Sequence, residues 1–290
     1  MVVRIPKEMA VRILNATSDA GSFVGELSLS LKSSVRLNTL DLGQNGFIGT
    51  IPIWIGGNMS SLKILHLRSN KFVGNIPPNL SRLSALQILD LASNNLSGTI
   101  PSSFGNLTAM KVSGEMNGTI LKNSIDYNEN MQVTIKGTYI EYAILLPLVI
   151  VVDLSNNNLS GMIPEKLTGL SGLVSLSLSR NHLTGEIIEN IGALQQLESL
   201  DLSRNNLFDG IPLSMIGRVP IDNQLQTFID PFIYIGNLDL CGFPLTQKCK
   251  DDKTNQGPNA VGGDEQNNNA MDEEGYEMKW LYMSMGLGFA

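Results

Sequence analysis

Apolar and polar positions follow one another along this chain in a register that recurs. A pattern of Leu-x-x-Leu-x-Leu-x-x-Asn fits six segments, and four of their five spacings are 24 or 25 residues. The six segments are residues 37–45, 62–70, 86–94, 149–157, 173–181 and 197–205. A fixed period of this length indicates stacked units, because no single unit can bury its apolar side chains without its neighbours.

Each unit predicts a strand, a turn and a short helical segment. In Leu40-Asp41-Leu42 the period of two makes a strand with both leucines directed inward and Asp41 outward, so stacked copies form a parallel sheet. The Asn that closes the pattern lies where the chain turns inward, and its amide can satisfy buried backbone groups. A following Gly permits a tight bend, and Ile-Pro opens a short helical turn. The expected fold is an α/β solenoid, an arc with the parallel β-sheet on its concave face.

The pattern is interrupted once, between residues 101 and 149. The interruption adds about 39 residues to one period and contains aromatic and β-prone residues, which favour a packed insertion over a disordered linker. We therefore divide the chain into seven parts. They are a divergent N-terminal segment (1–20), repeats (21–101), an island insertion (102–148), repeats (149–219), a C-terminal cap (220–250), an acidic juxtamembrane linker (251–279) and the start of a truncated transmembrane helix (280–290).

Charge and hydropathy depart from those of the repeats mainly near the C-terminus. Residues 251–279 hold eight of the 27 acidic residues against two lysines, which leaves the rest of the chain nearly neutral and without the basic cluster that nucleic acid requires. Residues 280–290 are uncharged and begin with Trp280, which is typical of the start of a membrane helix. A complete span needs about 20 residues, so this segment corresponds to about half of one. A short amphipathic tail is the alternative. The first eight residues lack the apolar core of a secretory signal peptide.

The residue types that carry metal or catalytic chemistry are sparse. Cys241 and Cys249 are the two cysteines, and a disulfide in the cap is a better interpretation than a zinc site, which needs four grouped ligands. His66 and His182 have no Cys or His companions at ligand spacing, and no Ser, His and Asp set has a recognisable nucleophile context. We therefore expect no cofactor, no metal and no enzymatic activity.

The outward strand positions predict a polar concave binding face for a protein or peptide, although solvated side chains alone would also explain them. The face consists of Asp41, His66, Arg68, Asp90, Asp153, Ser177, Arg180, Asp201 and Arg204. Seven Asn-x-Ser/Thr sequons indicate a secreted surface, although an Asn- and Ser-rich repeat also generates such triplets by itself. We favour Asn58, Asn79, Asn106 and Asn117 as acceptors over Asn95 and Asn158, which lie beside the Asn ladder, and over Asn15.

The repeat resembles the plant-specific class of leucine-rich repeat, and the insertion, cap, acidic linker and anchor resemble plant receptor-like proteins. The most similar type is the fungal-xylanase (EIX) receptor group. Within the insertion, Tyr127 followed after eight residues by Lys136-Gly137, with Tyr142 beyond, is similar to the Tyr-x8-Lys-Gly signature of that family's island.

This resemblance implies a non-catalytic, single-pass receptor on the extracellular face of the plasma membrane that acts in plant defence signalling. It would sense a microbial or endogenous protein or peptide. The island and last repeats would contact a co-receptor kinase, and an adaptor receptor-like kinase would associate through the membrane helix. A secreted inhibitor or scaffold, a developmental receptor and a non-functional truncated remnant remain as alternatives.

Overall fold

The computed structural model describes residues 10–12, 23–111, 131–135, 138–142, 150–216 and 230–249. For residues 10–12, 131–135, 138–142, 213 and 216 only the backbone is described. The chain divides into two units, Met1–Cys249 and Lys250–Ala290. The expected acidic linker and membrane-helix start both lie outside the described residues.

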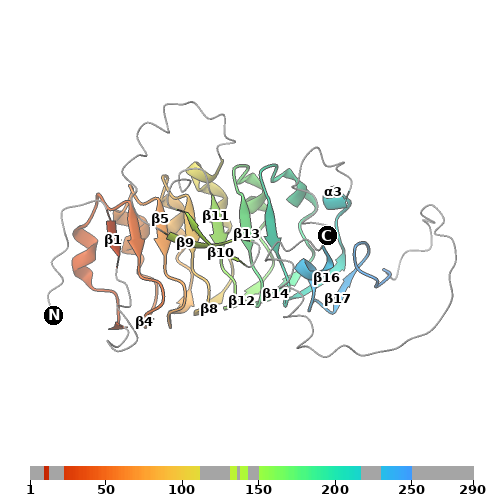
Figure 1. Ribbon diagram of the computed structural model, residues 1–290, viewed down its shortest axis with the longest axis horizontal. Helices are drawn as coiled ribbons and strands as arrows, with labels where there is room; N and C mark the ends of the chain where they lie inside the picture. The colour runs from red at the N-terminus through yellow and green to blue at the C-terminus, as the bar shows by residue number, and fades with distance from the viewer. Residues whose placement is uncertain are drawn as a thin grey trace, which may run out of the picture. The chain divides into compact units, whose positions relative to one another are not determined.

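The main sheet is parallel and receives one strand from each coil of the chain (Figure 1). In spatial order its strands are β1 (Ala10–Arg12), β3 (Thr39–Asp41), β5 (Ile64–His66), β7 (Ile88–Asp90), β11 (Val151–Asp153), β13 (Ser175–Ser177) and β15 (Ser199–Asp201). Although β7 and β11 flank the insertion, they are direct neighbours in register, so the sheet is continuous across it. β1 lies in the segment expected to diverge from the repeat, and it pairs with β3.

A second strand and a short helical segment complete each coil. The second parallel sheet has the order β17 (Asp239–Cys241), β16 (Asn206–Gly210), β14 (His182–Gly185), β12 (Asn158–Gly161), β8 (Asn95–Gly98) and β6 (Val73–Asn75), and β2 (Val24–Gly25) pairs with β4 (Gly46–Phe47). The helical segments are η1 (Leu29–Ser33), α1 (Trp54–Asn58), η2 (Pro78–Arg82), η3 (Ser102–Asn106), η4 (Thr108–Lys111), η6 (Glu165–Gly169), η7 (Glu189–Ala193), α3 (Leu213–Ile216) and η8 (Pro231–Tyr234). The α/β solenoid expected from the repeat is therefore confirmed.

The core between these layers is held by apolar side chains and by a ladder of asparagines. The strand-centre residues Leu40, Leu65 and Leu89 are fully buried. Asn94 shows the ladder geometry: its Nδ2 donates to the carbonyls of Leu67, Leu91 and Ala92, and its Oδ1 accepts from the Phe72 N–H at 3.1 Å. Each Asn thus joins its own coil to the preceding one. The ladder comprises Asn45, Asn70, Asn94, Asn157, Asn181, Asn205 and Asn237.

The insertion and the cap each add one further feature. Within the insertion, β9 (Met131–Ile135) and β10 (Thr138–Tyr142) form an antiparallel pair. In the cap, Asn237 continues the ladder by accepting a hydrogen bond from the Leu207 N–H at 3.0 Å, and Cys241 forms a disulfide with Cys249. No helix in the described part of the chain is long and apolar enough to cross a bilayer.

Candidate functional site on the concave face

The concave face consists of the side chains that alternate with the core residues of the main sheet. They form two columns across the strands, listed from β3 to β15: Thr39, Ile64, Ile88, Val151, Ser175 and Ser199, and then Asp41, His66, Asp90, Asp153, Ser177 and Asp201. Much of this face is shielded from solvent, since Ile88 is 1% exposed and Asp90 is 3% exposed.

The aspartates of the second column hold the loop that follows each strand. In every case Oδ1 accepts a hydrogen bond from the backbone N–H two residues later. The pairs are Asp41 with Gly43 (3.1 Å), Asp90 with Ala92 (3.1 Å), Asp153 with Ser155 (3.0 Å) and Asp201 with Ser203 (3.0 Å). This local bond is the one that an Asp offers at the start of a turn. The predicted binding aspartates thus have a structural role in these four coils.

His66 lies between two of these carboxylates. Its Nδ1 is 2.7 Å from Asp41 Oδ1, and its Nε2 is 3.5 Å from Asp90 Oδ2. The imidazole also occupies the space beside Gly43, where an added Cβ would lie 2.6 Å from His66 Cε1. Gly43 therefore makes room for the ring that links the first two aspartates.

Arg68 links the next two aspartates of the column, Asp90 and Asp153. Its Nε donates to Asp90 Oδ2 at 2.8 Å, and its Nη2 donates to Asp153 Oδ2. We call Asp41, His66, Asp90, Arg68 and Asp153 the ionic chain; all of its members are at most 9% exposed. With a neutral imidazole the five members of the ionic chain themselves carry three negative charges and one positive charge.

Burial and mutual repulsion shift two pKa values within the ionic chain. Burial, followed by the charge of Asp90, raises the pKa of Asp153 to about 6, while Arg68 and the hydrogen bonds from Ser155 oppose the shift. Burial alone lowers the pKa of His66, but the hydrogen bond to Asp41 and the charges of Asp90 and Asp41 outweigh it, so the pKa is raised above 6.5. Both groups therefore hold their protons more tightly than in an unfolded chain.

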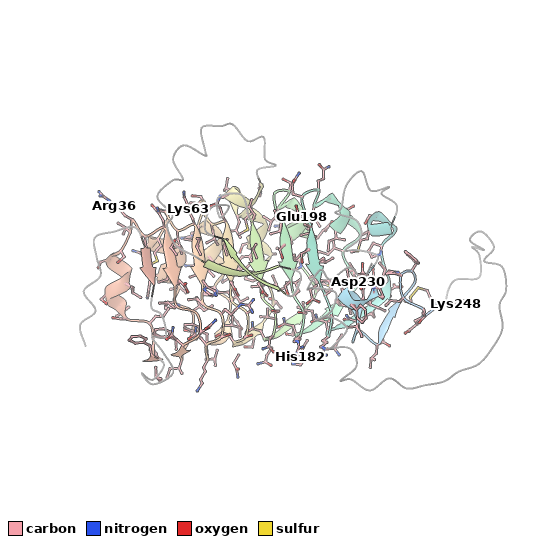
Figure 2. All side chains as sticks on the ribbon, in the orientation of Figure 1. Arg36, Lys63, His182, Glu198, Asp230 and Lys248 are labelled. Atoms are coloured by element: carbon pink, nitrogen blue, oxygen red, sulfur yellow. A yellow bond between two sulfur atoms is a disulfide. The ribbon has the colours of Figure 1, made fainter. Side chains whose placement is uncertain are left out.

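Towards β13 and β15 the face becomes rich in serine and more open. Ser177, Asp201 and Ser203 are half-buried, whereas Arg180 and Arg204 are exposed at equivalent positions of adjacent coils. Both arginines adopt positive φ, 53° and 54°, as the equivalent loop residues of the other coils do. The predicted face is therefore split into a buried ionic chain and an accessible polar surface with two guanidinium groups. Figure 2 draws the described side chains as sticks on the ribbon.

The predicted island residues fall largely outside the described part of the chain. Tyr127, Lys136 and Gly137 are among the residues that are not described, and Tyr142 is described only as the last backbone position of β10, paired with Met131. Their proposed contact with a co-receptor stays a prediction.

The predicted sugar acceptors differ in accessibility. Asn106 is exposed, whereas Asn58 and Asn79 are half-buried, and the Nδ2 of Asn79 donates to the Ile53 carbonyl. Asn117 lies outside the described residues. Asn95 and Asn158, which were less favoured, are both exposed.

Two features of the face were not singled out from the sequence. The serines at 175 and 179 follow the same period of two as the predicted Ser177, and that period is the signal that identifies them. The pairing of Arg68 with Asp153 has no local signal, because it joins residues from coils on either side of the insertion. Among the described residues, no group of three or more His, Cys, Asp or Glu side chains is placed to hold a metal ion.

The comparison with protein families agrees with the fold. The Leucine Rich Repeat model matches six segments, at residues 36–58, 61–83, 85–107, 149–170, 172–194 and 196–218. Among solved structures, a TDR receptor aligns with a TM-score of 0.52 at 26% identity, covering 67% of this chain and 27% of its own. Pollen Receptor Kinase 3 aligns with a TM-score of 0.51 at 28% identity, covering 72% of this chain and 78% of its own.

Curated relatives give the more specific similarity. Receptor-like protein EIX2 of Solanum lycopersicum is 41% identical over 159 residues, which cover 48% of this chain and 14% of the relative. Receptor like protein 26 of Arabidopsis thaliana is 38% identical over 154 residues, covering 50% of this chain and 19% of the relative. The chain thus spans less than a fifth of the length of these relatives. The chain is built from leucine-rich repeats and, over about half of its length, is similar to plant receptor-like proteins.

Proposed function

We propose that this chain is part of the ectodomain of a non-catalytic cell-surface receptor that binds a protein or peptide and recruits co-receptor and adaptor receptor-like kinases in plant defence signalling. The accessible surface at β13 and β15 carries the proposal. It offers hydroxyl groups and two exposed guanidinium groups, from Arg180 and Arg204, on a scaffold similar to proteins named as receptors. Exposed guanidinium groups form charge-assisted, often bidentate hydrogen bonds with carboxylates, and Arg is enriched among the residues that dominate protein interfaces.

Burial assigns different roles to the two parts of the concave face. The ionic chain is shielded and its groups are paired with each other, so it fixes the geometry of the face. Arg180 and Arg204 are exposed and available to a partner. In the complete protein, a membrane helix beginning at 280–290 and the insertion signature around Tyr127 and Lys136 would supply the anchor and the co-receptor contact.

A binding measurement tests this proposal. The full chain, secreted behind a cleavable signal, is assayed by biolayer interferometry against the soluble ectodomain of a plant co-receptor kinase, with and without fungal xylanase. We expect Tyr127→Ala plus Lys136→Ala to abolish co-receptor binding. Arg180→Ala plus Arg204→Ala should weaken ligand binding at least tenfold, the effect of losing about 1.4 kcal/mol of binding free energy.

A charge-matched control separates specific contacts from general electrostatics. Arg36 and Lys248 are exposed and lie outside the main sheet, so Arg36→Ala plus Lys248→Ala removes the same charge and should leave both affinities unchanged. Equal losses in the control and in the Arg180 and Arg204 variant would contradict the proposed ligand surface. Secretion of a folded chain that binds neither probe would contradict the receptor proposal itself.

A further inference from the structure

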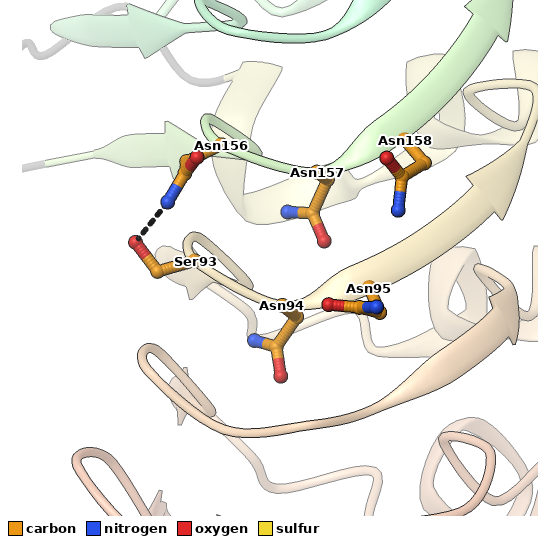
Figure 3. Close-up of a pocket in the computed structure, with 6 residues that line it drawn as sticks. All are labelled: Ser93, Asn94, Asn95, Asn156, Asn157 and Asn158. Atoms are coloured by element: carbon orange, nitrogen blue, oxygen red, sulfur yellow. Dashed lines mark hydrogen bonds between the residues drawn. The ribbon is translucent and has the colours of Figure 1, made fainter.

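Two adjacent coils repeat the same tetrapeptide at the edge of the second sheet. Asn94-Asn95-Leu96-Ser97 enters β8, and Asn157-Asn158-Leu159-Ser160 enters β12. The two strands are neighbours, with Asn158 in register with Ser97. In Figure 3 the two asparagine pairs lie one above the other on successive coils.

Within each tetrapeptide the two asparagines have opposite roles. Asn157 is 7% exposed, its Nδ2 donates to three carbonyl groups and its Oδ1 accepts from the Leu96 N–H, so its amide is fully used. Asn95 and Asn158 are exposed, and neither side chain has a hydrogen-bond partner in the described part of the chain. The first Asn of each tetrapeptide thus makes the hydrogen bonds of the ladder, whereas the side-chain amide of the second Asn is exposed to solvent.

The free asparagine has the sequence and geometry of a sugar acceptor. Leu96 and Leu159 are fully buried, whereas Asn95 and Ser97 lie on the outer side of β8, and Asn158 and Ser160 lie on the outer side of β12. Both triplets are Asn-x-Ser with a residue other than Pro in the middle, which is the acceptor sequon. We propose that Asn95 and Asn158 carry a pair of N-linked glycans on neighbouring coils. This inference rests on the proposed extracellular function, because the modification takes place in the secretory pathway.

The covalent step needs one co-reactant, an oligosaccharide on a polyprenyl diphosphate. A bond forms between the asparagine Nδ2 and C1 of the first sugar, the bond from C1 to the diphosphate oxygen breaks, and Nδ2 loses one proton. The released polyprenyl diphosphate carries away the bonding electrons. Asn79 contrasts with the proposed acceptors, because it is half-buried and its Nδ2 already donates to the Ile53 carbonyl.

The surroundings of the two acceptors can accommodate sugars. A shallow polar pocket of about 350 Å³ is lined by side chains of the two coils. Its residues are Ser93, Asn94, Asn95, Asn156, Asn157 and Asn158. Glycans there would cover this edge of β8 and β12 and leave the concave face as the surface open to a protein partner.

The chain provides a matched control at the same position of a later coil. Asn206 is exposed and follows the ladder residue Asn205, as Asn158 follows Asn157. The third residue of its triplet is Phe208 instead of Ser or Thr, so Asn206 is not in a sequon. Phe208 is 45% exposed, which permits its replacement. Phe208→Ser should create a new acceptor at Asn206, whereas Phe208→Ala should not.

The test is site-resolved mass spectrometry of the full chain expressed behind a cleavable secretory signal in eukaryotic cells. Peptide N-glycanase digestion in ¹⁸O-water marks each occupied Asn, and both medium and cell extract are analysed, counting only chains whose signal has been removed. We expect Asn95 and Asn158 to be occupied, Asn95→Gln and Asn158→Gln each to lose one glycan, and Phe208→Ser to gain one. Melting temperatures equal to that of the unsubstituted chain would show that each variant is folded.

Signal-cleaved chains in which the Asn95 and Asn158 peptides are unmodified would overturn the inference, whether or not Asn106 is occupied. This outcome is separable from failure of the proposed receptor function. A chain that is glycosylated at both sites but binds no partner leaves the inference intact and contradicts the receptor proposal. A chain that binds its partner with both sites unmodified supports the receptor proposal and contradicts the inference of glycans at Asn95 and Asn158.

Discussion

Arg68, two residues after β5, and Asp153 on β11 form a buried ion pair although 85 residues separate them in sequence. The same guanidinium donates to Asp90 on β7 at 2.8 Å, so one side chain connects three successive coils. The insertion lies between β7 and β11 in sequence. On the concave face, Arg68 therefore connects the coils that precede the insertion to the coil that follows it.

The first prediction concerns removal of this guanidinium. Arg68→Met keeps much of the aliphatic volume but leaves Asp90 and Asp153 buried without their positive partner, a change that typically costs about 3–5 kcal/mol. We expect the urea midpoint of unfolding to fall accordingly. The exposed Arg180→Met should change stability by less than about 0.5 kcal/mol. If Arg68→Met unfolds at the same urea concentration as Arg180→Met, the guanidinium does not compensate the two carboxylates.

The second prediction separates the ladder from its exposed neighbour. Asn205 accepts a hydrogen bond from the Leu183 N–H at 3.0 Å and donates to three carbonyls, so Asn205→Ala leaves several buried polar groups without partners. Each such group costs about 1–3 kcal/mol, and the loss should exceed about 2 kcal/mol. The exposed Asn206→Ala, made in parallel in bacterial protein, should be neutral. Chemical denaturation of both variants provides the measurement, and equal stabilities would argue against the ladder as a stabilising element.

Much of the fold could be predicted from local sequence because every unit has the same pattern of apolar and polar positions. Leu40, Leu65 and Leu89 occupy equivalent positions, so one correct interpretation of a unit transfers to the others. Asn237 has no complete repeat pattern before it, and its place in the ladder depends on the packing of the cap against β16.

The concave site was less predictable. The sequence identified the outward column, including Asp41, His66 and Asp90, but it gave no indication that these side chains are buried against one another. That burial depends on lateral contacts between coils, for example the ring of His66 over Gly43. Sequence patterns report the direction of a side chain along one strand, whereas pairing between strands depends on the stack as a whole.

The third prediction uses the contact between Gly43 and His66. In Gly43→Ala the new Cβ would lie 2.6 Å from His66 Cε1, so the ring must move away and weaken its hydrogen bond to Asp41. Because that bond contributes to the raised pKa of His66, the pKa should fall towards 6.5. An NMR titration of the His66 ring protons measures the change. Gly169→Ala meets no atom within 4 Å and is the matched control. An unchanged His66 titration in Gly43→Ala would contradict the assigned contact.

The last prediction is that the ionic chain makes the fold more stable in mildly acidic solution than at pH 8. His66 has a folded-state pKa above 6.5, so its contribution is complete below pH 6.5 and is lost as the pH rises through the higher folded value. Asp153 has a folded-state pKa of about 6 against 3.8, so its contribution declines between these values. Within the described part of the chain, the charged groups beside His66 are Asp41, Asp90 and Arg68, and those beside Asp153 are Asp90 and Arg68.

Unfolding by urea at intervals between pH 4 and pH 8 measures this dependence. Asp153→Asn should remove the slope below about pH 6, an effect of up to about 3 kcal/mol, whereas His66→Gln should remove the slope above about pH 6.5. The two substitutions act in different parts of the pH range because each removes a different group, Asp153 or His66, that binds its proton more tightly in the folded state. A chain whose stability rises steadily from pH 5 to pH 8 would show that protonation of the ionic chain does not govern the balance.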